Sequence, residues 1–322
     1  MDDMMKKIAL VNFSTLDYSI EETILRKAGY QVDVYDGIAT EDLPTAIKDA
    51  EVLVVQLQQV TEALLERMPS LKLIAREGIG LDSIPVQAAS ERGITVMNVP
   101  DYCLEEVAVH AVSLMLAAHR KLFPSSALVR GGQWTQMPEL KPIFALSELT
   151  LGLIGMGRIG AQVISRMRGF GCRIIVSDPY LHPDSAPEGV ELVSLDELLA
   201  QSDLITLHCP YTEETKHLID KRRIEKMKKK PVLINVSRGP LIHEGDLLDA
   251  LNSGDISFAG LDVLTQEPPA NDHPLLHHPK AIVTNHIAWY SEQSEARMRN
   301  LTSNRIVDFL EGREIPNVVN KK

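Results

Sequence analysis

The sequence is poor in cysteine, in positive charge and in long hydrophobic runs, and each shortage excludes a class of protein. Its three cysteines, Cys103, Cys172 and Cys209, form no C-x-x-C pair, which argues against a disulfide framework or a zinc site. Acidic residues outnumber basic ones by 44 to 33, and the net charge of −11 disfavours nucleic acids and anionic membranes as partners. No apolar run approaches the roughly 18 residues of a membrane span, and the first residues lack the apolar core of a signal peptide. We therefore expect a cytoplasmic protein that binds no metal.

One stretch, residues 149–178, carries the clearest functional signal. An apolar strand runs directly into Gly155, Gly157 and Gly160, an amphipathic helix follows, and a second strand ends at Asp178. In this G-x-G-x-x-G pattern the first glycine permits a tight turn, the second lets the backbone approach a pyrophosphate, and the third lets helix and strand pack closely. In its strand–helix–strand setting, the pattern predicts a dinucleotide-binding site.

The acidic residue at the end of the second strand predicts which dinucleotide binds. A carboxylate at Asp178 can accept hydrogen bonds from both ribose hydroxyls, whereas it would repel a 2′-phosphate. The unpaired N–H groups and the positive dipole end of the helix would hold the phosphates. The expected cofactor is therefore NAD rather than NADP.

Strands and helices alternate on both sides of this stretch, which predicts parallel sheets. The first hundred residues show the alternation without any dinucleotide fingerprint, and the strands resume after Asp178. We expect an α/β protein with two doubly wound parallel-sheet domains. The first hundred residues would form a flavodoxin-like domain, and the domain with the glycine fingerprint would be a Rossmann NAD-binding domain.

Three further segments have consequences for packing. Residues 105–122 are typical of a long helix that is apolar all round, and we expect it to pass between the domains or to pack against a partner subunit. Its histidines, His110 and His119, are expected to be structural. Residues 123–147 contain proline and glycine and predict a long connection, which suggests an interface or an excursion around the cofactor domain. The basic run within residues 218–229 predicts the solvated face of a helix rather than a nucleic-acid site.

Residues 76–82 form a candidate anion site in the first domain. The loop follows the carboxyl end of a predicted strand, where open α/β sheets bind ligands. Gly78 and Gly80 expose backbone N–H groups and Arg76 adds a fixed positive charge, so a carboxylate could bind here. An ordinary strand–helix turn with a surface arginine explains the same residues, and the local sequence leaves both interpretations open.

Several later strands end in ionisable residues of complementary chemistry. These are Arg238, Asp262 with Glu267 beyond it, and His286. Arginine can hold a carboxylate bidentately, histidine can transfer a proton near neutral pH, and a neighbouring carboxylate stabilises the imidazolium and selects its tautomer. With a nicotinamide supplying the hydride, these groups fit the interconversion of a 2-keto acid and a 2-hydroxy acid. A surface ion pair and a loop histidine are the alternative explanation.

Four motifs in this half resemble those of the D-isomer-specific 2-hydroxyacid dehydrogenases. The family's arginine, glutamate and histidine signatures resemble N-V-S-R-G (235–239), L-D-V-L-T-Q-E-P (261–268) and T-N-H-I-A-W-Y-S (284–291), and H-C-P-Y-T-E-E-T (208–215) also matches. The similarity spans nearly the whole chain. It implies an NAD-dependent D-2-hydroxyacid dehydrogenase or 2-keto acid reductase that forms a homodimer through its nucleotide domain. It also implies a discontinuous substrate domain, residues 1–100 and 290–322, into which the Rossmann NAD-binding domain, residues 101–289, is inserted.

The resemblance also implies the roles of individual residues. The catalytic residues would be Arg238, Glu267 and His286. Besides the three glycines, the cofactor would be contacted by Arg158, Ile159, Asp178, His208, Cys209, Pro210, Thr215, Val236, Ser237, Arg238, Asp262 and His286. The substrate would be contacted by Arg76, Gly78, Ile79, Gly80, Arg238, His286 and Trp289.

Within the family, residues 76–82, 99–108 and 288–293 look most like the C-terminal-binding-protein-like branch, in which a tryptophan lines the substrate pocket. This makes Trp289 a substrate-side candidate, although packing at an interdomain hinge would also explain it. Many relatives carry glutamate where this chain has Val109, which leaves the role of His110 open. The chain ends at Lys322, so we do not expect the regulatory domain of longer phosphoglycerate dehydrogenases or control by serine.

Two other functions compete with this prediction. An NAD(H)-sensing corepressor-like scaffold would be expected to carry additional partner-binding segments or tails. A formate dehydrogenase of the same superfamily would have no use for a proton acceptor, which argues against pairing His286 with Glu267. The complete set of arginine, glutamate and histidine favours the dehydrogenase, and the sequence does not name its keto acid.

Overall fold

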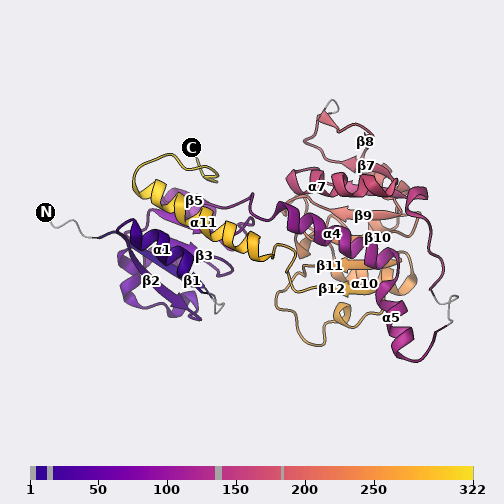
Figure 1. Cartoon of the computed structure of the whole chain (residues 1–322), viewed down its shortest axis with the longest axis horizontal. Helices are drawn as coiled ribbons and strands as arrows, with labels where there is room; N and C mark the ends of the chain where they lie inside the picture. The colour runs from indigo at the N-terminus through magenta and orange to yellow at the C-terminus, as the bar shows by residue number, and fades with distance from the viewer. Residues whose placement is uncertain (1–4, 13–16, 135–139, 183–184, 322) are drawn as a thin grey trace. The chain divides into compact units, whose positions relative to one another are not determined.

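Two compact units make up the chain. The computed structural model describes residues 5–12, 17–134, 140–182 and 185–321. Unit 1 comprises Met1–Cys103 and Ser291–Lys322, and unit 2 comprises Leu104–Tyr290. Figure 1 shows that each unit is a sheet with helices packed against it. Among the described residues, no helix has the length and apolar character required to cross a membrane.

Unit 1 is built on a five-stranded parallel sheet in the order β2-β1-β3-β4-β5. The strands are β1 (Lys7–Asn12), β2 (Gln31–Asp36), β3 (Ala50–Val55), β4 (Leu73–Arg76) and β5 (Thr95–Met97). The helices are α1 (Ser19–Lys27), α2 (Glu62–Glu66), α3 (Val86–Glu91) and α11 (Glu292–Leu310). Although α11 comes from the opposite end of the chain, it packs beside α1 (Figure 1). This is the doubly wound order of flavodoxin-like domains.

Unit 2 is built on a seven-stranded parallel sheet in the order β12-β11-β10-β9-β6-β7-β8. The strands are β6 (Thr150–Ile154), β7 (Arg173–Ser177), β8 (Val190–Leu192), β9 (Leu204–Leu207), β10 (Val232–Asn235), β11 (Phe258–Leu261) and β12 (Ala281–Val283). The helices are α4 (Leu104–His119), α5 (Leu122–Arg130), α7 (Arg158–Met167), α8 (Leu195–Gln201), α9 (Lys221–Ile224) and α10 (Glu244–Ser253). The strand order reverses between β6 and β9, as it does in Rossmann domains. The predicted fold class, two doubly wound parallel-sheet domains, is confirmed.

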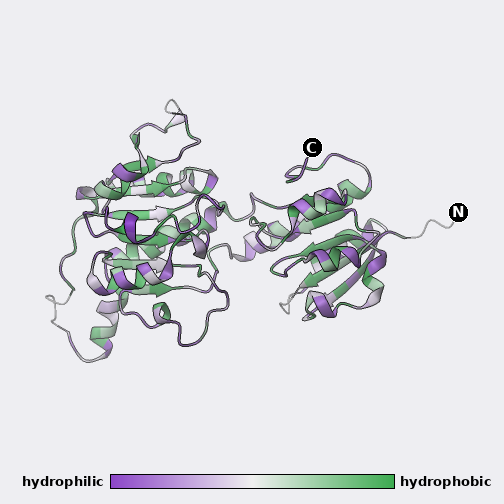
Figure 2. Ribbon diagram, turned by 180° about the vertical axis from the view of Figure 1, so that it is seen from behind, coloured by the Kyte–Doolittle hydropathy of each residue, from purple (hydrophilic) through white to green (hydrophobic). Residues whose placement is uncertain are grey.

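The sheet of unit 2 forms the core of the unit because helices cover it. Every residue of β9, β10 and β11 is buried, as expected for parallel strands with both faces covered. Figure 2 shows the hydrophobic residues gathered in the strands. Helix α4 packs against α7, β10 and β11, which explains why its pattern is so apolar.

Several elements differ from the expectation. The connection after α4 begins with a helix that was not expected, α5; Pro124 lies in the first turn of α5, where a missing N–H is tolerated. The basic run is not one long helix, since α9 ends at Ile224 and Lys230 adopts a left-handed backbone (φ 50°) just before β10. No pattern in the sequence predicted strand β8. Residues 135–139 of the connection lie outside the described residues.

Candidate functional site

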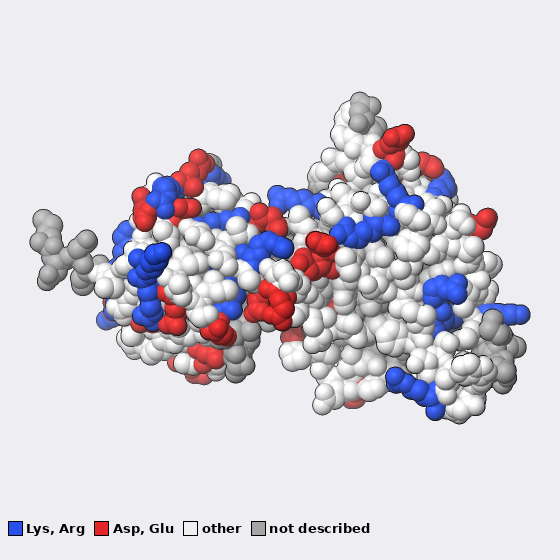
Figure 3. Space-filling model, viewed as in Figure 1, with Lys and Arg blue, Asp and Glu red and all other residues white. Residues whose placement is uncertain are grey.

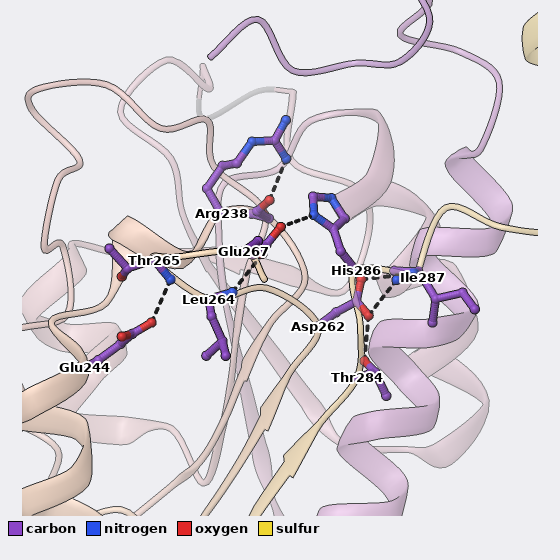
Figure 4. A network of polar contacts seen from close by, with 11 residues as sticks. Arg238, Glu244, Asp262, Leu264, Thr265, Glu267, Thr284, His286 and Ile287 are labelled. Atoms are coloured by element: carbon purple, nitrogen blue, oxygen red, sulfur yellow. Dashed lines mark hydrogen bonds and ion pairs between the residues drawn. The ribbon is translucent and has the colours of Figure 1, made fainter. Parts of the chain in front are cut away.

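The carboxyl ends of three neighbouring strands bring ionisable side chains together in unit 2. Arg238 follows β10, Asp262 directly follows β11, and His286 follows β12, while Glu267 lies on the loop after β11. Parallel strands all end at the same edge of a sheet, so these residues are neighbours in space although they are far apart in sequence. Figure 4 shows their side chains in one polar network.

His286 and Glu267 form the closest ionic contact of the network. The imidazole Nδ1 lies 2.6 Å from Glu267 Oε2, and about a third of each side chain is exposed. An ionised carboxylate can only accept hydrogen bonds, so Nδ1 carries the proton and Nε2 is the nitrogen left to exchange one with a ligand. The other oxygen, Oε1, accepts the backbone N–H of Leu264 at 2.9 Å. Both oxygens of Glu267 are therefore oriented.

Arg238 lies on a turn that is stabilised by hydrogen bonds of neighbouring residues. Its Nη1 donates to the carbonyl of Ser237 at 2.6 Å, and its own carbonyl accepts Asn235 Nδ2 at 2.8 Å. The Ser237 hydroxyl donates to Leu207 O at 2.8 Å, which ties the turn to the end of β9. The guanidinium is thus presented at the strand ends by a rigid backbone.

Asp262 is buried and directs its carboxylate at the backbone beside His286. It accepts the N–H groups of Ile287 and Ala288 at 3.0 and 2.9 Å and the Thr284 hydroxyl at 2.5 Å. Burial by itself would raise the pKa of Asp262, but hydrogen bonds from His110, Thr284 and Ala288 outweigh it and lower that pKa. The contact with Asp262 stabilises a turn in which His286 has a left-handed backbone (φ 55°).

His110, whose role the sequence left open, belongs to the same network. Its Nε2 lies 3.0 Å from Thr284 Oγ1 and 3.4 Å from Asp262 Oδ1. The histidine therefore reaches from α4 to the end of β12. Sequence alone could not show this, because the residues are joined only through the tertiary packing of α4 on the sheet.

The glycine-rich turn after β6 has the shape that a dinucleotide requires. Gly155 has φ 87°, and a Cβ there would lie 2.7 Å from Cys209 N. A Cβ on Gly160 would lie 2.7 Å from the carbonyl of Gly155, whereas one on Gly157 would meet nothing within 4 Å. The first and third glycines are therefore required by the fold. The space beside Gly157 is open to a ligand.

Asp178 lies beside this turn, as the fingerprint predicts. Its Oδ2 accepts the N–H of Met156 at 2.8 Å, and Oδ1 accepts the N–H of Tyr180 at 2.9 Å. Gly157 is the N-cap of α7 and provides no side-chain cap, so the first N–H groups of the helix face the same turn. A carboxylate, a helix N-terminus and an open glycine are the groups that fit the ribose and pyrophosphate of NAD.

The segment after β9 borders the same turn. Burial lowers the pKa of His208 to about 3, so its ring is neutral at physiological pH, and Nε2 lies 2.9 Å from Thr206 Oγ1. Within the described part of the chain, the buried Nδ1 of His208 has no hydrogen-bond partner. Burial also raises the pKa of the Cys209 thiol to about 11. Thr215 closes the loop by donating to Pro210 O at 2.8 Å.

The remaining substrate-side candidates divide between the units. Trp289 is half-buried in unit 2 and meets Tyr290 edge-on, with ring centroids 5.5 Å apart. Arg76, Gly78, Ile79 and Gly80 lie in unit 1, on the loop after β4. There the Arg76 guanidinium donates to the carbonyl of Glu77 and lies against Gly78, where a Cβ would be 2.4 Å from Nη1.

A buried acidic cluster in unit 1 was missed in the sequence. Arg299 of α11 binds both oxygens of Glu21 at 2.6 Å, and all three of Arg299, Glu21 and Glu77 are buried. Burial, and next the charge of Glu21, raise the pKa of Glu77 to about 8. Glu77 lies within the loop predicted as a candidate anion site. No local sequence pattern shows that it lies close to residues of α1 and α11. In the ranges that the structure describes, no group of three or more His, Cys, Asp or Glu could hold a metal ion.

Comparison with known proteins identifies the family of the chain. Residues 112–288, more than half of the chain, match the family model described as "D-isomer specific 2-hydroxyacid dehydrogenase, NAD binding domain". The chain belongs to this family. The matched residues lie within unit 2 and contain the glycine-rich turn, Asp178 and the network of Figure 4.

Members of the family resemble the chain along most of its length. It is 42% identical over 300 residues to D-3-phosphoglycerate dehydrogenase of Methanocaldococcus jannaschii, a match that covers 92% of this chain and 56% of that protein. It is 36% identical to hydroxypyruvate reductase of Blautia hydrogenotrophica, covering 89% and 91%. The structure of D-lactate dehydrogenase from Aquifex aeolicus, complexed with NAD and lactic acid, superposes with a TM-score of 0.87 at 32% identity, covering 94% and 96%. The chain spans about half the length of the phosphoglycerate dehydrogenases that it matches.

Proposed function

We propose that this protein is an NAD-dependent D-2-hydroxyacid dehydrogenase that acts as a reductase of a small 2-keto acid. The observation that carries the proposal is the 2.6 Å contact between His286 Nδ1 and Glu267 Oε2 beside Arg238, at the carboxyl edge of a Rossmann sheet. Relatives named hydroxypyruvate reductase, glyoxylate reductase and D-lactate dehydrogenase support a substrate with a short carbon chain.

In the proposed mechanism each side chain has one task. Arg238 pairs with the substrate carboxylate and polarises the neighbouring C2 carbonyl. His286 gives its Nε2 proton to the carbonyl oxygen during reduction and takes it back during oxidation. Glu267 holds the Nδ1 proton and so stabilises the imidazolium form. Bound NADH supplies the hydride for C2.

We also propose which residues hold the ligands. NAD would be bound by the three glycines, Asp178 and the residues that the family resemblance assigned around the ends of β6, β9 and β10. The proposed substrate contacts are Arg76, Gly78, Ile79, Gly80, Arg238, His286 and Trp289. The support for Arg76 to Gly80 is their place after the carboxyl end of β4 in unit 1. The support for Asp262 as a cofactor contact is its place at the end of β11.

A panel of keto acids tests the proposal. Purified protein is mixed with NADH and glyoxylate, pyruvate, hydroxypyruvate, phosphohydroxypyruvate or branched-chain and aromatic keto acids, and the configuration of the product is determined. We expect turnover of one class with a D product. His286→Ala should lower kcat by about 10²–10⁴-fold while NADH still binds. Tight NADH binding without turnover of any keto acid would overturn the proposal and favour a scaffold.

We further propose a homodimer in which α5 is covered by the partner. This helix has the sequence LFPSSALVR and no buried residue. Leu122, Phe123 and Val129 are 45–59% exposed. Figure 3 shows largely uncharged surface in the middle of unit 2, with Lys and Arg side chains around it near α5. Apolar surface of this kind is typical of subunit interfaces. The three free cysteines are compatible with the proposed cytoplasmic location.

A further inference from the structure

Two consecutive peptide groups, on either side of the Leu264 Cα, support the Glu267–His286 pair. Their N–H groups are taken by different carboxylates. Leu264 N donates to Glu267 Oε1 at 2.9 Å, and Thr265 N donates to Glu244 Oε1 at 2.7 Å. Figure 4 shows Glu244 reaching the Leu264–Thr265 peptide from α10, on the other side of the loop from Glu267.

The same peptide presses against the turn that carries Arg238. A Cβ on Gly239 would lie 2.0 Å from the carbonyl carbon of Leu264 and 2.4 Å from Thr265 N. Such distances leave room only for glycine. The Leu264–Thr265 peptide is therefore held between the Arg238 turn and Glu244. The adjoining peptide supplies the Leu264 N–H that orients the Glu267 carboxylate and, through Glu267, the His286 ring.

Glu244 itself is held from both sides. Its Oε2 lies 3.3 Å from His273 Nε2, and its side chain is 21% exposed. It is the first residue of α10, where a negative charge also faces the positive end of the helix. The packing of Leu264, Leu247 and Leu275 in one hydrophobic cluster fixes the backbone around it.

We propose that Glu244 is a positioning residue: by holding the Leu264–Thr265 peptide, it sets the distance and angle at which Glu267 meets His286. The inference rests on the proposed function only for its kinetic consequence. The geometric consequence concerns the His286 ring alone and holds whether or not a keto acid is turned over.

Two conservative substitutions distinguish the effect of the length of the Glu244 side chain from the effect of its charge. Glu244→Gln keeps an oxygen at the distance of Thr265 N and removes the charge. Glu244→Asp keeps the charge at the start of α10 but is one methylene too short to reach Thr265 N. If Glu244 acts by positioning, the glutamine variant should behave as the wild type and the aspartate variant should be impaired.

The primary readout is the NMR titration of the His286 ring in protein without substrate or cofactor. The signal is assigned by its loss in His286→Gln, and Glu267→Gln defines the titration without the carboxylate. We expect the Glu244→Asp midpoint to move from that of the wild type toward that of Glu267→Gln, and the Glu244→Gln midpoint to stay. In the keto acid assay, kcat of Glu244→Asp should fall about tenfold with KM for NADH unchanged.

Three results would overturn the proposal. One is a Glu244→Asp titration equal to that of the wild type. Another is the reverse order, with Glu244→Gln impaired and Glu244→Asp normal, which would mean that Glu244 acts by its charge on α10. The third is a parallel loss of thermal stability and NADH affinity in Glu244→Asp, which would mean a purely structural role. Absence of keto acid turnover in the wild type would instead contradict the proposed function and leave the titration test intact.

Discussion

Asp262 holds the backbone of His286 as well as the residues that follow it. The carbonyl of Asp262 accepts the N–H of His286 at 2.8 Å, and its carboxylate accepts the next two N–H groups. The side chain of Asp262 is 1% exposed. The left-handed turn that presents the imidazole is thus built around one buried carboxylate.

The first prediction concerns this carboxylate. Asp262→Asn replaces one acceptor oxygen by an NH2 group that faces backbone N–H groups, so the turn should open. We expect the free energy of unfolding of unit 2 to fall by about 1–3 kcal/mol and kcat to fall about tenfold or more. Urea unfolding followed by a signal from unit 2, and keto acid kinetics, measure the two effects. Unchanged kcat in a folded Asp262→Asn protein would contradict the assigned support.

A second prediction separates two glycines of the turn after β6. Gly155→Ala places a side chain on a left-handed residue (φ 87°) and 2.7 Å from Cys209 N, so we expect it to destabilise the protein by about 1–3 kcal/mol. Gly157→Ala meets nothing within 4 Å and should melt as the wild type does, but its methyl group occupies the space proposed for pyrophosphate. Calorimetry should therefore detect a loss of stability in Gly155→Ala but not in Gly157→Ala, and NADH titration should detect a loss of affinity in Gly157→Ala. Full NADH affinity in Gly157→Ala would contradict the proposed binding mode.

Cofactor choice gives the third prediction. Asp178→Asn keeps an acceptor for the N–H of Met156 and removes the charge that would repel a 2′-phosphate. We expect the ratio of kcat/KM for NADH over that for NADPH to fall. Asp203→Asn is the matched control, because Asp203 accepts the N–H of Thr150 at the opposite end of β6, at 2.9 Å. A change of preference in the control alone would contradict the role of Asp178.

The fourth prediction concerns the pH dependence of unit 1. Burial and the charge of Glu21 raise the pKa of Glu77 from 4.5 to about 8, so the folded state binds this proton more tightly than the unfolded chain. The contribution of Glu77 to stability is therefore complete below pH 4.5 and is lost as the pH rises through about 8. We expect Glu77→Gln to flatten this decline.

Urea unfolding of unit 1 between pH 5 and pH 9 measures the decline. Glu91→Gln is the control, because Glu91 is exposed and its removal should leave the pH dependence as it is in the wild type. A slope that is the same in Glu77→Gln and in the wild type would show that another group is responsible.

The local sequence was sufficient to predict two kinds of feature: turns that require glycine, and residues that lie at the ends of strands. The glycine fingerprint located β6, α7 and Asp178. Arg238, Glu267 and His286 could be grouped because parallel strands share an edge. Their individual roles stay a prediction.

Other features depended on contacts that no local pattern encodes. Helix α5 has no buried face, so it shows no core-facing period, and the basic segment after Asp220 ends its helix early because the chain must turn into β10. The hydrogen bond from Thr265 to Glu244 joins residues 21 positions apart through a loop. Sequence determined the two sheets and the edge at which the chemistry gathers, because periodicity and glycine conformation are local properties. The tertiary structure alone decided how carboxylates such as Asp262 and Glu244 hold that edge, because their partners meet only when the loops pack.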